Sequence, residues 1–240
     1  MQAWMQWLLQ GIFPPRCPSC SAPTVAAGML CAECFRAAHR LSAPHCAQCG
    51  IPFAVPMPEG SLCIACIEVP PDYDQARAVY AYDGVISALI ARLKYQDRMQ
   101  GLALYAQQLQ CVMPQPQYDA IVPVPLHWRR LLKRRYNQAA WLAYALAGRT
   151  QLPCEPAWLM RVRHTEPQSK RTRRERLKAM RAVFAVPPAQ QAVVKGANIL
   201  LVDDVMTTGA TASACARALK DAGAARVDVV TLARTLKDRL

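Results

Sequence analysis

The residues with the clearest chemical potential lie at 203–211, where two acids precede a loop rich in threonine. The apolar run before them predicts a buried strand that delivers Asp203 and Asp204 to its carboxyl end. Backbone N–H groups at the start of the next helix would hold an anion, and Gly209 would let the backbone approach it closely. Since carboxylates repel phosphate, we expect the two acids to bind neutral sugar hydroxyls. The segment predicts a ribose 5′-phosphate site, with the phosphate held by Val205, Met206, Thr207, Thr208, Gly209, Ala210 and Thr211.

Eight of the eleven cysteines form four Cys-x-x-Cys pairs, separated by ten, eleven and thirteen residues. Each pair can turn two thiolates toward one tetrahedral ion, and two pairs complete a Cys₄ site, so the pattern predicts one or two structural zinc ions. Disulfides would need an oxidising compartment, and a redox pair would occur singly; an iron–sulfur cluster remains an alternative. We expect successive pairs to combine, although a crossed pairing stays open. The predicted ligands are Cys17, Cys20, Cys31 and Cys34 for one ion, and Cys46, Cys49, Cys63 and Cys66 for the other.

This Cys-rich stretch, residues 1–70, is predicted to be a small module of its own. It has few large apolar residues, so bound metal would supply much of its folding energy. Its formal charges sum to zero, which argues against it as the main nucleic-acid contact. We expect it to brace the fold or to bind a protein partner. Cys111, Cys154 and Cys215 stand apart and are interpreted as ordinary thiols.

The net charge of +13 is concentrated in one quarter of the chain. Residues 128–184 hold fifteen Lys or Arg against three Asp or Glu, a local excess of +12. Such a segment suits a polyanion such as diphosphate, a nucleotide or single-stranded DNA. The alternative is a solvated loop whose charges only keep the protein soluble.

From residue 71 to 240 the pattern changes to alternating strands and helices, which predicts an α/β domain with a doubly wound parallel sheet. Ligands of such a sheet bind at the carboxyl ends of its strands. The run 198–232 is predicted as a strand–helix–strand unit, with Gly223 ending the helix. Predicted strands cover 74–82, 118–124, 198–203 and 226–232. Predicted helices cover 84–92, with an extension toward 94–95 left open, 128–146 and 211–222.

The strand, the acid pair and the Thr-Thr-Gly-Ala-Thr loop resemble the signature of type I phosphoribosyltransferases. The whole chain resembles the ComF family of competence and GntX-like proteins, which joins a Cys-rich zinc module to such a domain. Family patterns occur at 119–126 (DAIVPVPL), at Arg134 with 136–138 (YNQ), at 161–168 (RVRHTEPQ) and at Glu175, Arg176 and Phe184. The chain departs from the pattern at Arg135, Arg171 and Ala179, where a glycine, an apolar residue and an asparagine are usual.

The resemblance implies roles for the residues that match. Asp203 and Asp204 would hold the ribose hydroxyls at a catalytic centre, and 207–211 the 5′-phosphate of phosphoribosyl diphosphate. The loop after Val124, with Arg129 and Arg130, would face the diphosphate and its Mg²⁺. Residues 161–178 correspond to the loop that closes over the sugar in such enzymes.

Three functions follow as hypotheses. The first is an enzyme that transfers a phosphoribosyl group, in which acids and Mg²⁺ stabilise opposite charges of the transition state. The second is a protein that binds a nucleotide or single-stranded DNA during DNA uptake, natural competence or DNA utilisation, as ComF members are associated with. Trp128, Tyr136, Trp141 and Tyr144 could stack on bases, although core packing explains Trp141 and Tyr144 as well. The third is an adaptor for a partner in the competence machinery.

The first fifteen residues are apolar but lack a basic leading segment and a cleavage site, so they do not predict a signal peptide. Trp4, Trp7 and Leu8 fall at helical spacing, which favours a short docked helix over a membrane-surface anchor. No apolar run reaches the length of a membrane span. We therefore expect a cytoplasmic protein.

Overall fold

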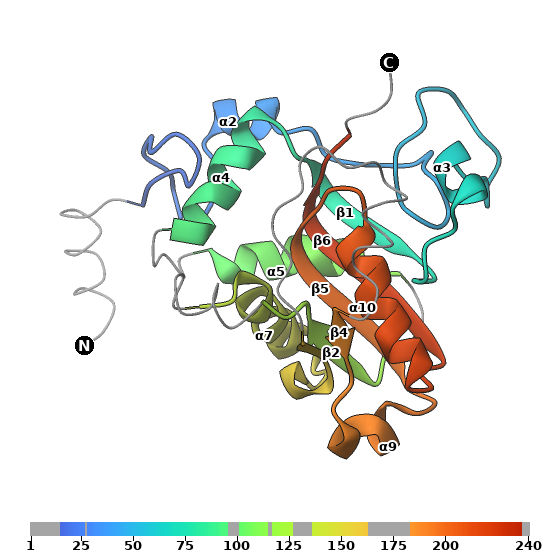
Figure 1. Ribbon diagram of the computed structural model, residues 1–240. Helices are drawn as coiled ribbons and strands as arrows, with labels where there is room; N and C mark the ends of the chain where they lie inside the picture. The colour runs from blue at the N-terminus through green and yellow to red at the C-terminus, as the bar shows by residue number, and fades with distance from the viewer. Residues whose placement is uncertain are drawn as a thin grey trace, which may run out of the picture.

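The structure is a computed structural model that describes residues 15–26, 28–95, 101–114, 117–126, 136–162 and 183–236. At the centre of this described part lies a four-stranded parallel sheet with the strand order β1-β6-β5-β2 (Figure 1). Its strands are β1 (Ala76–Ala81), β2 (Ala120–Pro123), β5 (Asn198–Met206) and β6 (Arg226–Arg234). Because these strands run in one direction, their carboxyl ends meet at one edge of the sheet. The predicted parallel sheet is confirmed.

The strand–helix–strand unit of β5, α10 (Ala210–Asp221) and β6 forms the best-buried part of the domain. Leu200, Leu201 and Val230 are fully buried, as expected for central strands covered on both faces. The α10 helix ends at Asp221 with Ala222 as its C-cap, and Gly223 follows with a φ of +95°, a left-handed conformation that glycine adopts without steric cost. The prediction for this unit is confirmed, except that β5 and β6 run two to three residues further than expected.

Helices cover both faces of the sheet (Figure 1). On one face, α4 (Gly84–Tyr95), α5 (Leu102–Cys111) and α7 (Gln138–Thr150) share a core with the strands, in which Ile90, Leu109 and Leu146 pack with Leu200. On the other face, Leu219 of α10 packs against alternate residues of β5. Alternate side chains of β5 thus pack into two separate cores, one on each face of the sheet.

The prediction of one continuous helix over 128–146 is wrong at 136–137. Tyr136 and Asn137 are not helical, and α7 begins at Gln138. The Asn137 side chain caps the helix by accepting a hydrogen bond from the Ala139 backbone N–H at 3.1 Å. Asparagine favours this position because its side chain satisfies an N–H that has no partner inside the helix. Residues 127–135 lie outside the described part of the chain.

Shorter elements connect α7 to β5. They are η1 (Pro156–Trp158), β3 (Met160–Arg161), β4 (Phe184–Ala185), η2 (Pro188–Gln190) and α9 (Gln191–Val194). The β3 and β4 strands pair antiparallel, and Phe184 belongs to the core on the α10 face. The two strands that flank the predicted closing loop, β3 and β4, therefore lie beside α10. Most of that loop, 163–178, lies outside the described residues.

The Cys-rich module packs directly on the sheet domain. Its short helices are α2 (Ala32–Ala37) and α3 (Ile64–Glu68). On the side of α2, the Ser19 hydroxyl donates to the Val85 carbonyl at 3.0 Å, and Arg92 donates to the Ser21 hydroxyl at 2.7 Å. On the side of α3, the Gln48 carbonyl accepts a hydrogen bond from the Ala76 N–H of β1 at 2.7 Å. The module thus contacts the sheet domain beside both α2 and α3, and residues 39–41 between them also bond to β1.

The segment that joins the module to the domain is fixed to α10 and β6. The Asp72 carboxylate accepts hydrogen bonds from Ser213 at 2.6 Å and from Arg217 at 2.7 Å. Asp74 pairs with Lys220 at 2.9 Å and accepts from the Val227 N–H at 2.8 Å. These contacts make the joining segment part of the α10 face. No helix in the described part of the chain is long and apolar enough to cross a membrane.

Candidate functional site

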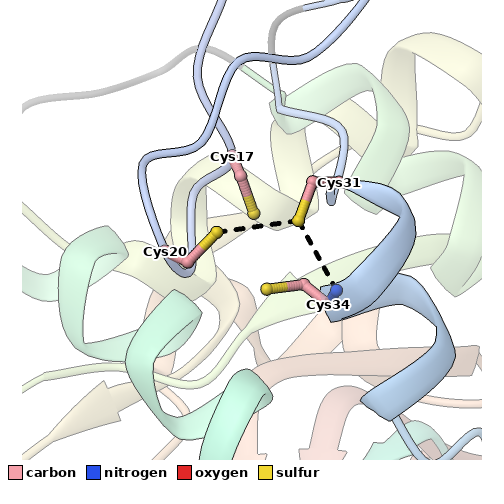
Figure 2. Close-up of side chains that lie close together, drawn as sticks. All are labelled: Cys17, Cys20, Cys31 and Cys34. Atoms are coloured by element: carbon pink, nitrogen blue, oxygen red, sulfur yellow. Dashed lines mark hydrogen bonds between the residues drawn. The ribbon is translucent and has the colours of Figure 1, made fainter.

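Four thiols converge beside α2 to form the first Cys₄ cluster. Figure 2 shows Cys17 and Cys20, from one loop, pointing toward Cys31 and Cys34 at the start of α2. The four sulfur atoms all lie within 4.8 Å of one another, and those of Cys20 and Cys31 are 3.6 Å apart. A zinc tetrahedron with Zn–S bonds near 2.3 Å has edges of about 3.8 Å. The cluster therefore has the donors and the spacing of a structural zinc site.

The second Cys₄ cluster consists of Cys46, Cys49, Cys63 and Cys66, and its sulfur atoms also lie within 4.8 Å of one another. Over the described residues, successive pairs have combined as predicted, and neither cluster includes a histidine. His39 instead lies 2.5 Å from the Asp83 carboxylate. Cys46, Cys49 and Cys66 are buried, whereas Cys20 of the first cluster is exposed. The two clusters thus differ in how deeply they are built into the protein.

Backbone N–H groups stabilise the thiolate form in both clusters, as zinc ligation requires. Burial opposes ionisation of Cys17, but hydrogen bonds from the backbone N–H groups of Cys20 and Cys31 lower its pKa to about 6. Hydrogen bonds from the Cys49 and Cys66 thiols lower the pKa of Cys46, to which the Cys49 and Cys63 N–H groups also donate. In the same clusters the pKa of Cys34 is raised, mainly by burial, and that of Cys66 is raised, mainly by its hydrogen bond with Cys46. One thiol of each cluster therefore ionises more easily than its neighbours.

The predicted phosphate loop lies at the carboxyl end of β5. The prediction that this loop starts at Val205 is wrong by two residues, because β5 pairs with β6 as far as Met206. The Met206 side chain is buried, so only its backbone could contact a ligand. The loop itself is 207–209, in which Thr207 is exposed and Thr208 is half-buried. Ala210 and Thr211 then form the first turn of α10.

Gly209 gives the loop its shape. Its φ of +78° is left-handed, and it occupies the N-cap position of α10. A Cβ placed there would lie 3.1 Å from the Tyr73 hydroxyl. The first N–H groups of α10 have no partners within the helix, and the twelve-residue helix adds its dipole. This arrangement is suited to binding an anion.

The acid pair stands just before this loop. Asp203 and Asp204 are half-buried residues of β5, and the Asp203 carboxylate accepts a hydrogen bond from the Asp204 N–H at 2.8 Å. Asp203 and Arg161 of β3 both act electrostatically on the buried Cys215 thiol, whose pKa is raised, mainly by burial. Arg161 pairs with Phe184, which lies in one core with Leu201 of β5 and Cys215 of α10, so the start of the predicted closing loop lies on the α10 face of the sheet.

Asn137 and Gln138, beside the end of β2, are further polar residues at the same edge of the sheet. Asn137 donates to the Val124 carbonyl at 3.1 Å, which ties the start of α7 to the strand end. The neighbouring Gln138 is buried, and its Nε2 has no hydrogen-bond partner among the described residues. Arg129 and Arg130, predicted to face the diphosphate, lie outside the described part of the chain.

Two residues beside the loop were missed by the sequence analysis. Tyr73 is buried in the joining segment, with its hydroxyl next to Gly209. Arg234, at the carboxyl end of β6, is buried beside Met206. The signal for Arg234 was a cation two residues after a predicted buried strand, where a buried charge needs a partner.

Comparison with known proteins places both halves of the chain. Residues 8–67 match the double zinc ribbon domain, and residues 144–240 match the phosphoribosyl transferase domain. The chain is 32% identical to the DNA utilization protein YhgH of Salmonella typhi over 232 residues, which covers 93% of this chain and 98% of that protein. The chain belongs to the ComF family.

Two further relatives and one solved structure align with different shares of the chain. Competence protein F of Haemophilus influenzae is 28% identical over 238 residues, covering 94% of this chain and all of that protein. Competence protein ComFC of Bacillus subtilis is 32% identical over 165 residues, covering 67% and 65% of the two chains. Among solved structures, glutamine phosphoribosylpyrophosphate amidotransferase from B. subtilis has a TM-score of 0.39 and 20% identity, over 58% of this chain and 30% of that chain.

Proposed function

We propose that this ComF-family protein binds phosphoribosyl diphosphate, or a nucleotide with the same 5′-phosphorylated ribose, at the carboxyl end of β5. The observation that carries the proposal is the left-handed Gly209 at the start of α10, directly after Asp203 and Asp204. The helix start supplies N–H donors for a phosphate, and Thr207, Thr208 and Thr211 add hydroxyl donors. The two carboxylates supply acceptors for the ribose hydroxyls.

We propose that Mg²⁺ binds together with the diphosphate, and not to the protein alone. A diphosphate group carries several negative charges next to two carboxylates, and a hard divalent cation reduces their repulsion. The protein groups proposed to face the diphosphate are Arg129, Arg130 and the carboxyl end of β2. Whether a bond at the sugar is then broken is decided by measuring diphosphate release with candidate acceptors.

The proposed biological role is in DNA uptake, natural competence or DNA utilisation. Relatives that align with more than nine-tenths of the chain carry the names DNA utilization protein and Competence protein F. A protein that recognises a phosphorylated ribose has the chemistry to act on nucleotides or on a DNA end. A protein partner in the competence machinery is part of the same proposal.

Calorimetric titration tests the ligand. Phosphoribosyl diphosphate and ribose 5-phosphate are titrated into the wild type, into Asp203→Asn with Asp204→Asn, and into Asp221→Asn. Asp221 is an exposed residue at the far end of α10 and serves as the control. We expect the double variant to weaken binding about tenfold or more, by loss of charge-assisted hydrogen bonds, while the control binds as the wild type does. Equal binding by all three proteins would contradict the assignment of the acids.

A second candidate function is binding of single-stranded DNA as an adaptor without catalysis. The observation that favours it is the excess of +12 over residues 128–184. Within the described part of that segment, Tyr136 and Trp141 stack on each other with ring centroids 4.1 Å apart, and Trp141 packs against the α7 core. Tyr144 is 53% exposed and is the better candidate for stacking on a base.

The salt dependence of DNA binding tests this second candidate. Changing Arg171, Arg173 and Arg174 to Gln should flatten the slope of log K against log salt by about 2, since each phosphate contact on a single strand contributes about 0.7. An unchanged slope would remove this run from the interface.

A further inference from the structure

The second Cys₄ cluster is part of the core that supports the phosphate loop. Cys46, Cys49 and Cys66 pack in one apolar cluster with Met206 and with residues of α10. Gly50, the residue after Cys49, has a φ of +68°, and a Cβ there would lie 2.2 Å from the Ala76 carbonyl oxygen of β1. The cluster is therefore seated on the sheet with no room for a side chain between them.

Arg234 connects this cluster to the loop. Its side chain is 6% exposed, and its Nη1 donates a hydrogen bond to the Cys49 carbonyl and lies 3.5 Å from the Met206 sulfur. Met206 is the last residue of β5, and the loop 207–209 follows at once. The Met206 carbonyl also accepts a hydrogen bond from the Thr235 N–H at 3.0 Å, so both sides of Met206 are held by the end of β6.

A second connection runs through Tyr73. The Gln48 side chain, between Cys46 and Cys49, donates to the Tyr73 carbonyl at 3.3 Å. The Tyr73 hydroxyl lies next to Gly209, where an added Cβ would also come within 3.8 Å of the Met206 sulfur. Arg234 thus contacts the end of the loop at Met206, and Tyr73 contacts it at Gly209. Arg234 also contacts Cys49 and Tyr73 contacts Gln48, so both residues are anchored to the same Cys-x-x-Cys turn.

The charge of a loaded cluster explains why a buried arginine is placed here. A zinc ion with four thiolates carries a net charge of about −2, and three of these thiols are buried. A buried charge is stable only when it is paired. Arg234 acts electrostatically on Cys49, and Arg77 donates to the Ala47 carbonyl at 3.0 Å. Both cations face the cluster, but of these two only Arg234 also contacts Met206.

We propose that Arg234 is a positioning residue through which the second zinc cluster sets the geometry of the phosphate loop. The cluster holds Arg234 by its charge and by the Cys49 carbonyl, and Arg234 holds Met206. The loop then presents its N–H groups in the arrangement that a sugar phosphate needs. The proposal deepens the proposed function and rests on it for the nature of the ligand.

The test compares Arg234→Met with the matched control Arg77→Met. Zinc content is measured by mass spectrometry of the metal, and ribose 5-phosphate affinity by calorimetry. We expect Arg234→Met to keep its zinc and to bind about tenfold more weakly, within the usual range of coupling between two sites. Arg77→Met should keep both zinc and affinity, and Arg234→Lys should recover most of the affinity because it keeps the charge. Wild-type affinity in Arg234→Met, or an equal loss in both Met variants, would overturn the proposal.

A measurement without ligand separates this proposal from the proposed function. Amide hydrogen exchange of the peptide 204–211 should be faster in Arg234→Met than in the wild type. If no sugar phosphate binds to the wild type, the proposed function fails, but the exchange result still decides whether Arg234 holds the loop. Unchanged exchange would overturn the positioning role.

If Arg234→Met does not fold, amide hydrogen exchange without ligand can be measured on two cysteine variants instead. Cys63→Ser removes one ligand of the second cluster, and Cys20→Ser removes one exposed ligand of the first. We expect faster exchange at 204–211 only for Cys63→Ser. Equal exchange rates in these two variants would show that the second cluster has no particular hold on the loop.

Discussion

Replacement of Gly209 by alanine tests the conformation of the phosphate loop most simply. At a φ of +78°, an L-residue costs about 1–2 kcal/mol relative to glycine. The new Cβ would also lie 3.1 Å from the buried Tyr73 hydroxyl, a contact that requires the loop or the tyrosine to move. We expect a total loss of about 2 kcal/mol of unfolding free energy, which lowers Tm by about 4–8 °C in a protein of this size. The same movement should weaken sugar-phosphate binding about tenfold or more, since a helix N-terminus binds phosphate through closely placed N–H groups.

Two other glycines provide controls for this experiment. Gly196 has a φ of +80°, but a Cβ added there would meet no atom of the described residues within 4 Å, so Gly196→Ala should lower Tm while leaving ligand affinity unchanged. Gly148 lies inside α7, where an added Cβ would likewise have no described neighbour within 4 Å, and Gly148→Ala should raise stability by about 0.5–1 kcal/mol. Thermal melts and calorimetric titrations on the three variants check these outcomes. Wild-type Tm and affinity in Gly209→Ala would refute the left-handed loop.

Three further predictions concern the metal sites, the core and the remaining thiols. Metal analysis should find about two zinc ions per chain, with one lost in Cys17→Ser or Cys46→Ser and none in the exposed Cys111→Ser; full retention in a cluster variant would contradict the Cys₄ assignment. Asp228 is fully buried and accepts hydrogen bonds from the Gln75 N–H, the Tyr118 hydroxyl and Arg226, so Asp228→Asn should cost about 2–3 kcal/mol in denaturant unfolding, against almost nothing for the exposed Asp221→Asn. Burial, helped by Glu155, raises the pKa of the Cys154 thiol to about 11, so this thiol should stay protonated and unreactive toward iodoacetamide at pH 8 and react only as the pH approaches 11. The exposed Cys111 should react at pH 8, and equal labelling of the two thiols at that pH would contradict the raised pKa of Cys154.

The sequence predicted those parts of the fold in which local pattern and tertiary environment agree. The run from 199 to 202 is apolar without alternation, and a strand buried on both faces needs that pattern. Gly209 and Gly223 stand where left-handed backbone is required, which placed the limits of α10 to within one residue. The cysteine spacing likewise predicted which thiols combine.

Other features depended on contacts that no local pattern carries. The start of α7 was misplaced because a basic, aromatic segment has ordinary helix propensity, and the cap at Asn137 depends on its contact with Val124. Val205 and Met206 were assigned to the loop because β5 runs beyond its apolar stretch, supported by pairing with β6. Arg234 and Tyr73 acquire their roles only when the second cluster is docked on the sheet, and a net charge of zero gave no sign of where the module would dock.

The most direct measurement of the central claim is an amide NMR titration of the isotope-labelled, zinc-loaded protein with ribose 5-phosphate. If the sugar phosphate binds at the end of β5, the largest shifts will fall on the N–H groups of 207–211. In Asp203→Asn with Asp204→Asn, these shifts will become smaller at the same ligand concentration, in proportion to the affinity lost. Saturable shifts centred on another part of the chain, with 207–211 unmoved, would contradict the proposed site.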